Sequence, residues 1–178
     1  MPGVLRVLVV DLPRSVRTVS AQDAAGLAPL GPHYDRGLAN LAREFAAAEF
    51  ELETVTYEGG TFEVASSDWV YTSSLPLLFT QALARFAPDA DLARGVLFCV
   101  PDRYQFGFHV CRDAEEAARA LMIMPTFALN AYDDGVSPLS PHTYLWRDGE
   151  VSQLTEVTDT TLSVHPGPHL EALFSQWD

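Results

Sequence analysis

Residues 94–113 read RGVLFCVPDRYQFGFHVCRD, and this stretch predicts two neighbouring antiparallel strands. The segment GVLFCV is almost continuously apolar, which is typical of a strand covered on both faces of a sheet. Proline and aspartate in residues 101–104 favour a tight loop. The chain then returns over YQFGFHV, so Val100 is expected to face Gln105 and Cys99 to face Phe106. The stretch therefore predicts a sheet that contains antiparallel strands.

Both cysteines of the chain lie in this stretch, at Cys99 and Cys111. In the expected register Cys111 faces Arg94, about five strand positions or roughly 17 Å from Cys99. This separation is too long for a disulfide or for a shared metal ion. We therefore predict that each cysteine is a small buried apolar side chain and not a nucleophile.

Three other segments carry strand patterns. Residues 4–10, VLRVLVV, form a second apolar run that is read as a central strand covered on both faces. The segment ELETVTYEGGTFEVASSD predicts a hairpin with a Gly59-Gly60 turn, in which Val55 faces Val64. The segment TYLWRDGEVSQLT predicts another hairpin around Asp148-Gly149, with Arg147 opposite Glu150.

Helices are expected at about residues 20–26, 32–50, 73–87, 113–125 and 168–177. Ser20, either Ser73 or Ser74, and Asp113 are the expected N-terminal caps. Residues 125–142 are rich in Pro, Asp, Asn and Ser and are expected to be irregular. The pattern predicts one α+β domain over residues 1–178, with an antiparallel or mixed β-sheet and helices packed mainly on one face.

Composition and charge limit the classes of partner. The 178 residues carry a net charge of −13, which disfavours nucleic acid and anionic membrane surfaces as partners. All basic residues are arginines, so a phosphate-binding lysine and a lysine Schiff base are both excluded. The apolar N-terminal run is too short to span a bilayer and lacks a cleavage pattern. Free cysteines without a secretion signal favour a cytoplasmic protein.

One candidate ligand site involves two similar strand ends. VVDLPR at residues 9–14 resembles CVPDR at residues 99–103, since each apolar strand ends in an acid, a proline and an arginine. If the strands are parallel neighbours, Asp11, Arg14, Asp102 and Arg103 gather at one sheet edge, where open α/β sheets bind ligands. If they are antiparallel, these residues lie at opposite ends. His109 is a further candidate for this site, and a purely local turn role for Asp102 stays open.

The sequence gives weaker support for a metal site or for a nucleophilic active site. His165, His169 and Glu171 could form a loop chelate, although the intervening prolines prevent a regular helix between the histidines. A serine nucleophile would need Ser73 or Ser74 together with a base and an acid. The candidate partners are His109 or His142, and Asp102 or Asp133. The G-x-S-x-G motif is absent, so a capping role for the serine is favoured. We expect no metal and no cofactor.

The order of three short motifs resembles the bacterial YtpQ-like proteins, a family of unknown function. The motifs are SSLPL at residues 73–77, VPDRYQF at 100–106 and SPLSPHTYLWRDGEV at 137–151. Ser73 or Ser74, Pro101 and Arg103 match the family pattern, whereas Tyr104 stands where the pattern has aspartate. The resemblance covers about residues 5–150. It implies a cytoplasmic bacterial protein and no particular activity.

Two hypotheses on function follow from the sequence. The first is a non-catalytic acidic domain that acts through protein–protein contact, with Tyr132 and Trp146 as candidate surface aromatics. The second is a small-molecule-binding protein or hydrolase with its site around Arg14, Asp102, Arg103 and His109. The sequence does not decide the oligomeric state, and a homodimer is one arrangement that it permits.

Overall fold

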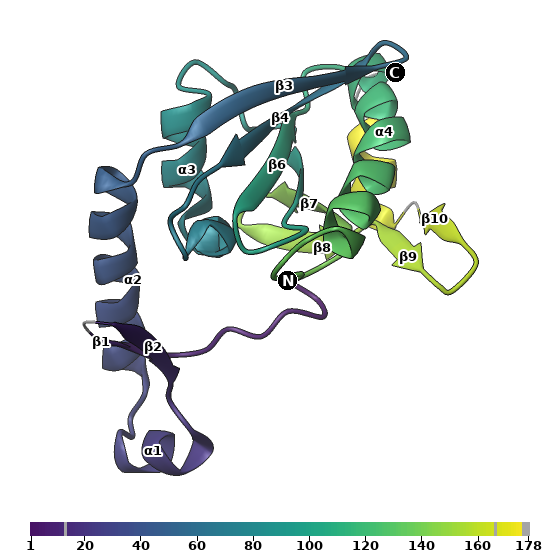
Figure 1. Cartoon of the computed structure of the whole chain (residues 1–178). Coiled ribbons are helices and arrows are strands. Elements are labelled where there is room, and N and C mark those ends of the chain that lie inside the picture. The colour runs from purple at the N-terminus through teal and green to yellow at the C-terminus, as the bar shows by residue number, and fades with distance from the viewer. Residues whose placement is uncertain (13, 166, 176–178) are drawn as a thin grey trace. The chain divides into compact units, whose positions relative to one another are not determined.

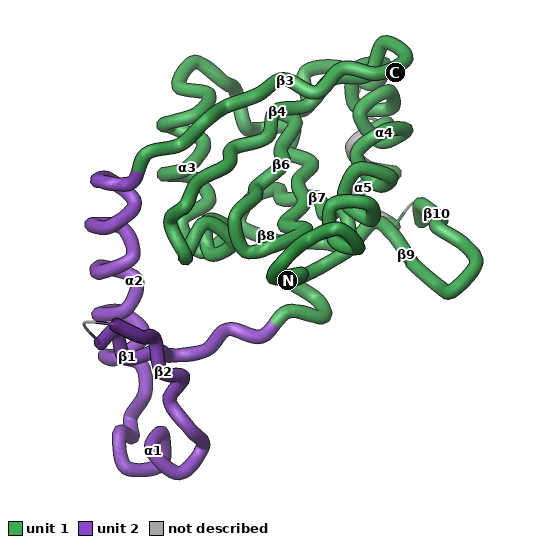
Figure 2. Tube along the Cα trace, in the orientation of Figure 1, with its two compact units in different colours: residues 1–4, 49–178 green, residues 5–48 purple. Residues whose placement is uncertain are grey.

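A computed structural model describes residues 1–12, 14–165 and 167–175 of the chain. The chain divides into two compact units (Figure 2). The smaller unit spans Leu5–Ala48, and the larger one consists of Met1–Val4 and Glu49–Asp178. Each unit is described by itself below.

The larger unit is built around a six-stranded sheet in which every neighbouring pair is antiparallel (Figure 1). The strand order is β3-β4-β6-β5-β7-β8. The strands are β3 (Glu51–Tyr57), β4 (Gly60–Ser66), β5 (Val96–Cys99), β6 (Gln105–Val110), β7 (Thr143–Arg147) and β8 (Glu150–Gln153). A separate two-stranded sheet pairs β9 (Thr155–Val157) with β10 (Leu162–Val164).

Helices cover both faces of the six-stranded sheet. The helical elements are η1 (Thr72–Leu78), α3 (Phe79–Phe86), α4 (Ala114–Asp133) and α5 (Pro168–Ser175). On one face α4 buries Leu121 and Met124 against Phe62, Leu97 and other core residues. On the opposite face Phe79 places its ring 5.0 Å from that of Phe98. The predicted α+β class with an antiparallel sheet is confirmed.

The smaller unit contains a β-ribbon and two helices. The ribbon pairs β1 (Val9–Leu12) with β2 (Ser15–Thr18) as a sheet of its own. It is followed by α1 (Ala21–Gly26) and α2 (Gly31–Ala47). The predicted cap on α1 is confirmed, because the Ser20 hydroxyl accepts the Asp23 N–H at 3.1 Å.

The prediction of a central strand at residues 4–10 is wrong. The strand is shorter and shifted, over Val9–Leu12, and all four of its residues are exposed. The strand at the centre of the main sheet is β5, whose two edges are occupied by β6 and β7. An apolar run indicates that a strand needs cover, but it does not say which neighbours supply it.

Two predicted strand registers also need correction. Cys99 faces Gly107 and not Phe106, one position away from the expected pairing. Val55 faces Phe62 and not Val64, because the turn is made by Glu58 and Gly59, whose φ angles are 47° and 81°. Gly60 lies instead in β4, where a side chain would come within 2.5 Å of the Arg119 carbonyl oxygen of α4. The predicted pairing of Arg147 with Glu150 is confirmed.

Two helix boundaries differ from the predictions. Helix α4 continues through Pro125 to Asp133, although an internal proline costs roughly 3 kcal/mol. Met124 and Ala128 are fully buried on either side of this proline, so apolar burial outweighs the lost hydrogen bond. Ser73 and Ser74 lie inside η1, whose N-terminal residue Tyr71 provides no side-chain cap, so their predicted capping role is wrong. Asp113 caps α4 as predicted.

Candidate functional site

The Asp102 side chain shapes the loop between β5 and β6. Its Oδ1 accepts the Tyr104 N–H at 2.7 Å, and the residue is 7% exposed. The backbone around it is tied to the segment after α4, because the Arg103 N–H donates to the Ser137 carbonyl at 3.1 Å. Gly135 approaches Asp102 so closely that a side chain at Gly135 would lie 3.0 Å from the Asp102 Cβ. These contacts give Asp102 a local structural role.

The candidate residues of the predicted ligand site are divided between the two units. Asp11 and Arg14 belong to the Leu5–Ala48 unit, whereas Asp102, Arg103 and His109 belong to the larger one. Since β5 pairs with β6 and β7, it is not a parallel neighbour of β1. His109 faces Leu97 inside the sheet, whereas Asp102 lies in the loop after the end of β5.

His109 is the most unusual buried polar side chain of the larger unit. It is 8% exposed, and its Nδ1 lies 2.8 Å from the Thr61 carbonyl oxygen, to which it can only donate. The other nitrogen, Nε2, is buried and has no hydrogen-bond partner among the described residues. Burial lowers the pKa of His109, against the opposing effects of the Thr61 hydrogen bond and the Glu116 carboxylate. The buried environment therefore favours the neutral form of the imidazole in the native state.

Both cysteines are free and buried, as predicted. Burial raises the pKa of Cys99 and of Cys111 to about 12. A thiol with such a pKa is protonated at neutral pH and is a poor nucleophile.

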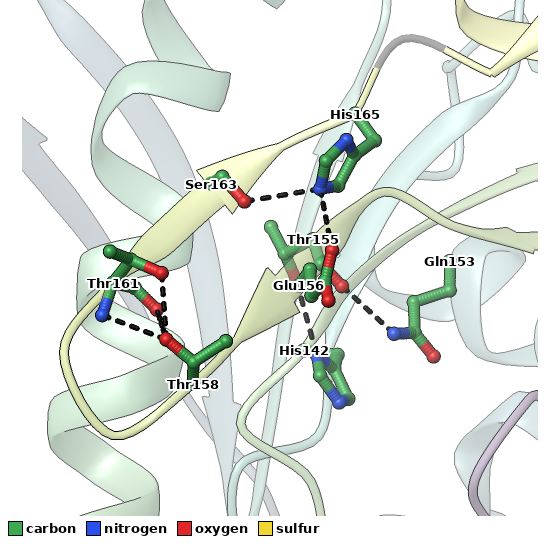
Figure 3. A network of polar contacts seen from close by, with 8 residues as sticks. All are labelled: His142, Gln153, Thr155, Glu156, Thr158, Thr161, Ser163 and His165. Carbon is green, nitrogen blue, oxygen red and sulfur yellow. Dashed lines mark hydrogen bonds and ion pairs between the residues drawn. The ribbon is translucent and has the colours of Figure 1, made fainter.

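The residues around β9 and β10 form a polar network (Figure 3). His165 Nε2 lies 2.9 Å from Glu156 Oε2 and 3.1 Å from Ser163 Oγ. A catalytic triad needs the serine and the acid on different nitrogens of the imidazole. Here both approach the same nitrogen, and Glu156 and Ser163 are a directly opposed pair of the ladder. The side chains of the ion pair are 60% and 63% exposed, so this is a surface ion pair.

A second part of the network joins the start of β7 to β9. The Thr155 hydroxyl accepts the Thr143 N–H at 2.9 Å and lies 3.4 Å from Nδ1 of His142. Burial lowers the pKa of His142. The hydrogen bonds of His109, His142 and Asp102 thus lead to backbone groups and a threonine, and not to Ser73 or Ser74. This arrangement positions strands and is not that of a nucleophile with its base.

No group of three or more His, Cys, Asp or Glu side chains suited to a metal ion occurs among the described residues. His165 of the predicted chelate is engaged by Glu156. The side chain of His169 lies outside the described part of the chain, so the chelate itself stays untested.

The smaller unit exposes apolar side chains on its ribbon and on the segment before it. Arg6 stacks on the ring of Tyr34 in α2, with its Cζ 4.5 Å from the ring centroid, and Leu8 lies close to Gly37 of the same helix. Leu5 and Val7 of this segment are 88% and 53% exposed. Within the ribbon, Val9 and Val16 lie on one face and are 37% and 46% exposed, while Val10 and Leu12 on the other face are 40% and 46% exposed. We call Leu5, Val7, Val9 and Val16 the apolar stripe.

The described residues of the smaller unit contain almost no core of their own. Phe45 alone, at 5% exposure, is buried among residues 5–12 and 14–48. An isolated two-stranded ribbon is at best marginally stable in water. The sequence signal for the stripe was present in VLRVLVV, but the same pattern is typical of a core strand and was interpreted as one. The predicted surface aromatics Tyr132 and Trp146 are half-buried, and Trp146 stacks on Phe79 at 4.8 Å.

No family model, no curated protein and no solved structure matches this chain. Within its described residues, the structure has no helix with the length and apolar character needed to cross a membrane. The geometry of the chain itself therefore carries the functional argument.

Proposed function

We propose that this chain is a non-catalytic acidic domain that acts through protein–protein contact, with the apolar stripe of the Leu5–Ala48 unit as its contact surface. The exposed stripe is the observation that carries the proposal. Water-exposed aliphatic side chains gain free energy when a partner covers them, at roughly 25 cal/mol per Å². Exposed apolar surface that gathers in one region often serves as an interaction site.

The distribution of charge supports the same surface. The Leu5–Ala48 unit has five arginines and four acidic residues, a net charge of +1. The rest of the chain has six arginines and twenty acidic residues, a net charge of −14. Charged residues are depleted at the centres of protein interfaces. The nearly neutral unit therefore suits an interface better than the strongly anionic one does.

The alternative, a small-molecule or hydrolase site around Arg14, Asp102, Arg103 and His109, has less support. Asp102 is used by its own loop, and the Nδ1 of His109 is engaged by the Thr61 carbonyl oxygen. Membership of the YtpQ-like family and a cytoplasmic location stay predictions from the sequence. Neither one assigns an activity.

Site-specific photo-crosslinking in the cells that make this protein tests the proposal. A photoreactive amino acid at Val9 of the stripe is expected to capture a protein in a defined adduct. The matched control is the same amino acid at Val136 of the larger unit, which is 88% exposed and also apolar. Adducts at Val9 and none at Val136 support the proposed surface. The absence of adducts at Val9, or equal labelling at both positions, contradicts it.

A further inference from the structure

We infer that the outer edge of β3 binds an extended, basic segment of another protein as an additional antiparallel strand of the six-stranded sheet. This edge belongs to the larger unit and is separate from the apolar stripe. β3 is the outermost strand of the sheet, and its one neighbouring strand is β4 (Figure 1). In the part of the chain that the structure describes, no strand pairs with its other edge. An exposed sheet edge can bind a peptide through main-chain hydrogen bonds.

The hairpin turn determines which backbone groups of β3 point outward. Residues 58–59 have φ angles of 47° and 81°, which is typical of a two-residue type I′ turn. Such a turn makes Tyr57 and Gly60 a hydrogen-bonded pair. Hydrogen-bonded and non-hydrogen-bonded pairs alternate along an antiparallel ladder. The N–H and C=O groups that point away from β4 are therefore those of Leu52, Thr54 and Thr56.

β3 lacks most of the features that block a sheet edge. Natural edges are protected by proline, by charged side chains and above all lysine, by a β-bulge, or by a very short strand. The segment ELETVTY contains neither proline nor lysine, and it pairs one-to-one with β4 from Glu51 to Tyr57. Every residue of β3 is exposed except the half-buried Val55. The opposite edge strand, β8, has four residues and is followed by β9 after one residue. β3 is therefore the longer of the two edges.

Charge selects the kind of strand that fits this edge. Glu51 and Glu53 are the charged residues of β3, and both lie on the same face of the sheet. The β4 residues opposite them, Ser66 and Val64, are uncharged. Cross-strand pairs of opposite charge are favourable, whereas like charges opposite each other are unfavourable. A strand with arginine or lysine opposite the two glutamates therefore gains ion pairs that β4 does not supply.

The same charges disfavour a second copy of this chain as the added strand. A second copy would bring its own glutamates and a net charge of −13. The larger unit alone carries −14, so long-range attraction also favours a basic partner. The half-buried Val55 and the 62% exposed Tyr57 share the face of the glutamates. A matching antiparallel strand therefore carries apolar residues on this face in its first half and basic residues in its second half.

Fluorescence anisotropy with a labelled synthetic peptide and the full chain tests the inference. The peptide has about seven residues, a usual strand length, and alternates threonine with valine in its first half and with arginine in its second half. We expect a dissociation constant on the order of 10 to 100 µM, because the contact is smaller than a standard interface. Added salt should weaken binding, since the ion pairs are exposed. A control peptide with glutamate in place of arginine should bind at least about tenfold more weakly.

Two pairs of variants separate main-chain pairing from a general attraction of charge. Thr54→Pro removes an outward N–H at the centre of the edge, where proline is tolerated, and should weaken binding by about tenfold or more. Thr54→Ala is its control, because it removes the same side chain and its hydrogen bond to Glu63 but keeps the N–H. Glu53→Gln should weaken binding about two- to fivefold. Asp159→Asn removes one charge from the connection between β9 and β10 and should leave binding unchanged.

Four results would overturn the inference. They are no binding of the arginine peptide at about 1 mM, equal binding of the two peptides, wild-type binding by Thr54→Pro, and a dimer of the chain that Thr54→Pro abolishes. The last result would make a second copy the occupant of the edge. If circular dichroism shows that Thr54→Pro is unfolded, equal binding by Glu53→Gln and Asp159→Asn would overturn the inference instead. The crosslinking experiment at Val9 concerns a different surface, so the proposed function and this inference can fail separately.

Discussion

Two apolar runs of this chain, residues 4–10 and residues 95–100, have similar compositions and opposite environments. All four residues of β5 are 0% exposed, whereas Val9 and Val10 of β1 are 37% and 40% exposed. β5 has strands on both edges and helical elements over both faces, while β1 pairs with β2 in a two-stranded sheet. An apolar run therefore predicts a strand, and the topology decides whether neighbouring strands lie on both of its edges.

Truncation of Phe98 should have the largest effect on stability. Phe98 is fully buried, with its ring 5.0 Å from that of Phe79 and 5.3 Å from that of Tyr144. Phe98→Ala should lower the free energy of unfolding by about 3–5 kcal/mol, because it leaves a cavity and removes these ring contacts and a third one with Phe106. Urea unfolding followed by circular dichroism measures this change. Val9→Ala in the ribbon should stay within about 0.5 kcal/mol of the wild type, and equal losses in both variants would remove the contrast between the two runs.

The next largest loss of stability is expected when a side chain is added at Gly107, because the added atoms overpack the core. A Cβ at Gly107 would lie 2.7 Å from the Cys99 Sγ across the β5–β6 ladder. Gly107→Ala should destabilise the chain by about 1–3 kcal/mol. With Cys99→Ala in the same chain, the combined loss should be smaller than the sum of the two single losses, because the sulfur that the new methyl group meets is gone.

The matched control for Gly107 lies in the smaller unit. Gly37 is inside α2, and the nearest atom to an added Cβ there is a Leu8 methyl carbon at 3.7 Å, an ordinary contact. Gly37→Ala should be neutral or stabilising by up to about 1 kcal/mol, since alanine favours a helix more than glycine does. A loss from Gly37→Ala as large as that from Gly107→Ala would show that packing does not distinguish the two sites.

Local sequence patterns predicted those parts of the fold that local chemistry determines. The Ser20 and Asp113 caps and the Asp148-Gly149 hairpin follow from short-range hydrogen bonds and turn geometry, and all three are confirmed. The register after Cys99 was wrong by one residue, because loop length depends on tertiary contacts such as that between Arg103 and Ser137. The role of Gly60 depends on the approach of α4, which no local pattern encodes.

The candidate site was less predictable than the fold. Asp102 and its proline were recognised as unusual, but the same residues suit a turn, and the structure uses Asp102 in that way. The unpaired Nε2 of His109 depends on its burial, which the alternation of YQFGFHV indicates only in part. The apolar stripe was visible as a run of aliphatic residues. The exposure of these side chains depends on what packs against them, and a local sequence pattern does not contain that information.

His109 gives the larger unit a dependence of stability on pH. Burial lowers its pKa from the ordinary 6.5, so below that pH the unfolded chain binds a proton that the folded chain resists. The contribution of His109 to the free energy of unfolding is fully present above the pKa that the residue has in the unfolded chain. It is lost as the pH falls towards the pKa of His109 in the folded chain. The urea concentration at the midpoint of unfolding should therefore fall as the pH is lowered from about 7 to about 5.

His109→Gln isolates this dependence from that of other groups. Glutamine does not titrate, so the variant should lose less stability than the wild type over the same pH interval, whatever its stability at pH 7. Arg112, Asp113 and Glu116 affect the same histidine and stay unchanged in both proteins. His142→Gln is a useful comparison, because burial also lowers the pKa of that residue, which is less buried. If the urea midpoint of His109→Gln falls with pH as steeply as that of the wild type, His109 is not the source of this pH dependence.

The smallest effect is expected for Val16→Thr in the ribbon. Val16 is 46% exposed, so a hydroxyl at this position remains in water and the free energy of unfolding should change by less than about 0.5 kcal/mol. The same substitution at the fully buried Val96 of β5 should cost about 1–3 kcal/mol, because the hydroxyl leaves water. Urea unfolding of the two variants measures both changes in the free energy of unfolding. A loss for Val16→Thr as large as that for Val96→Thr would mean that Val16 is buried in solution.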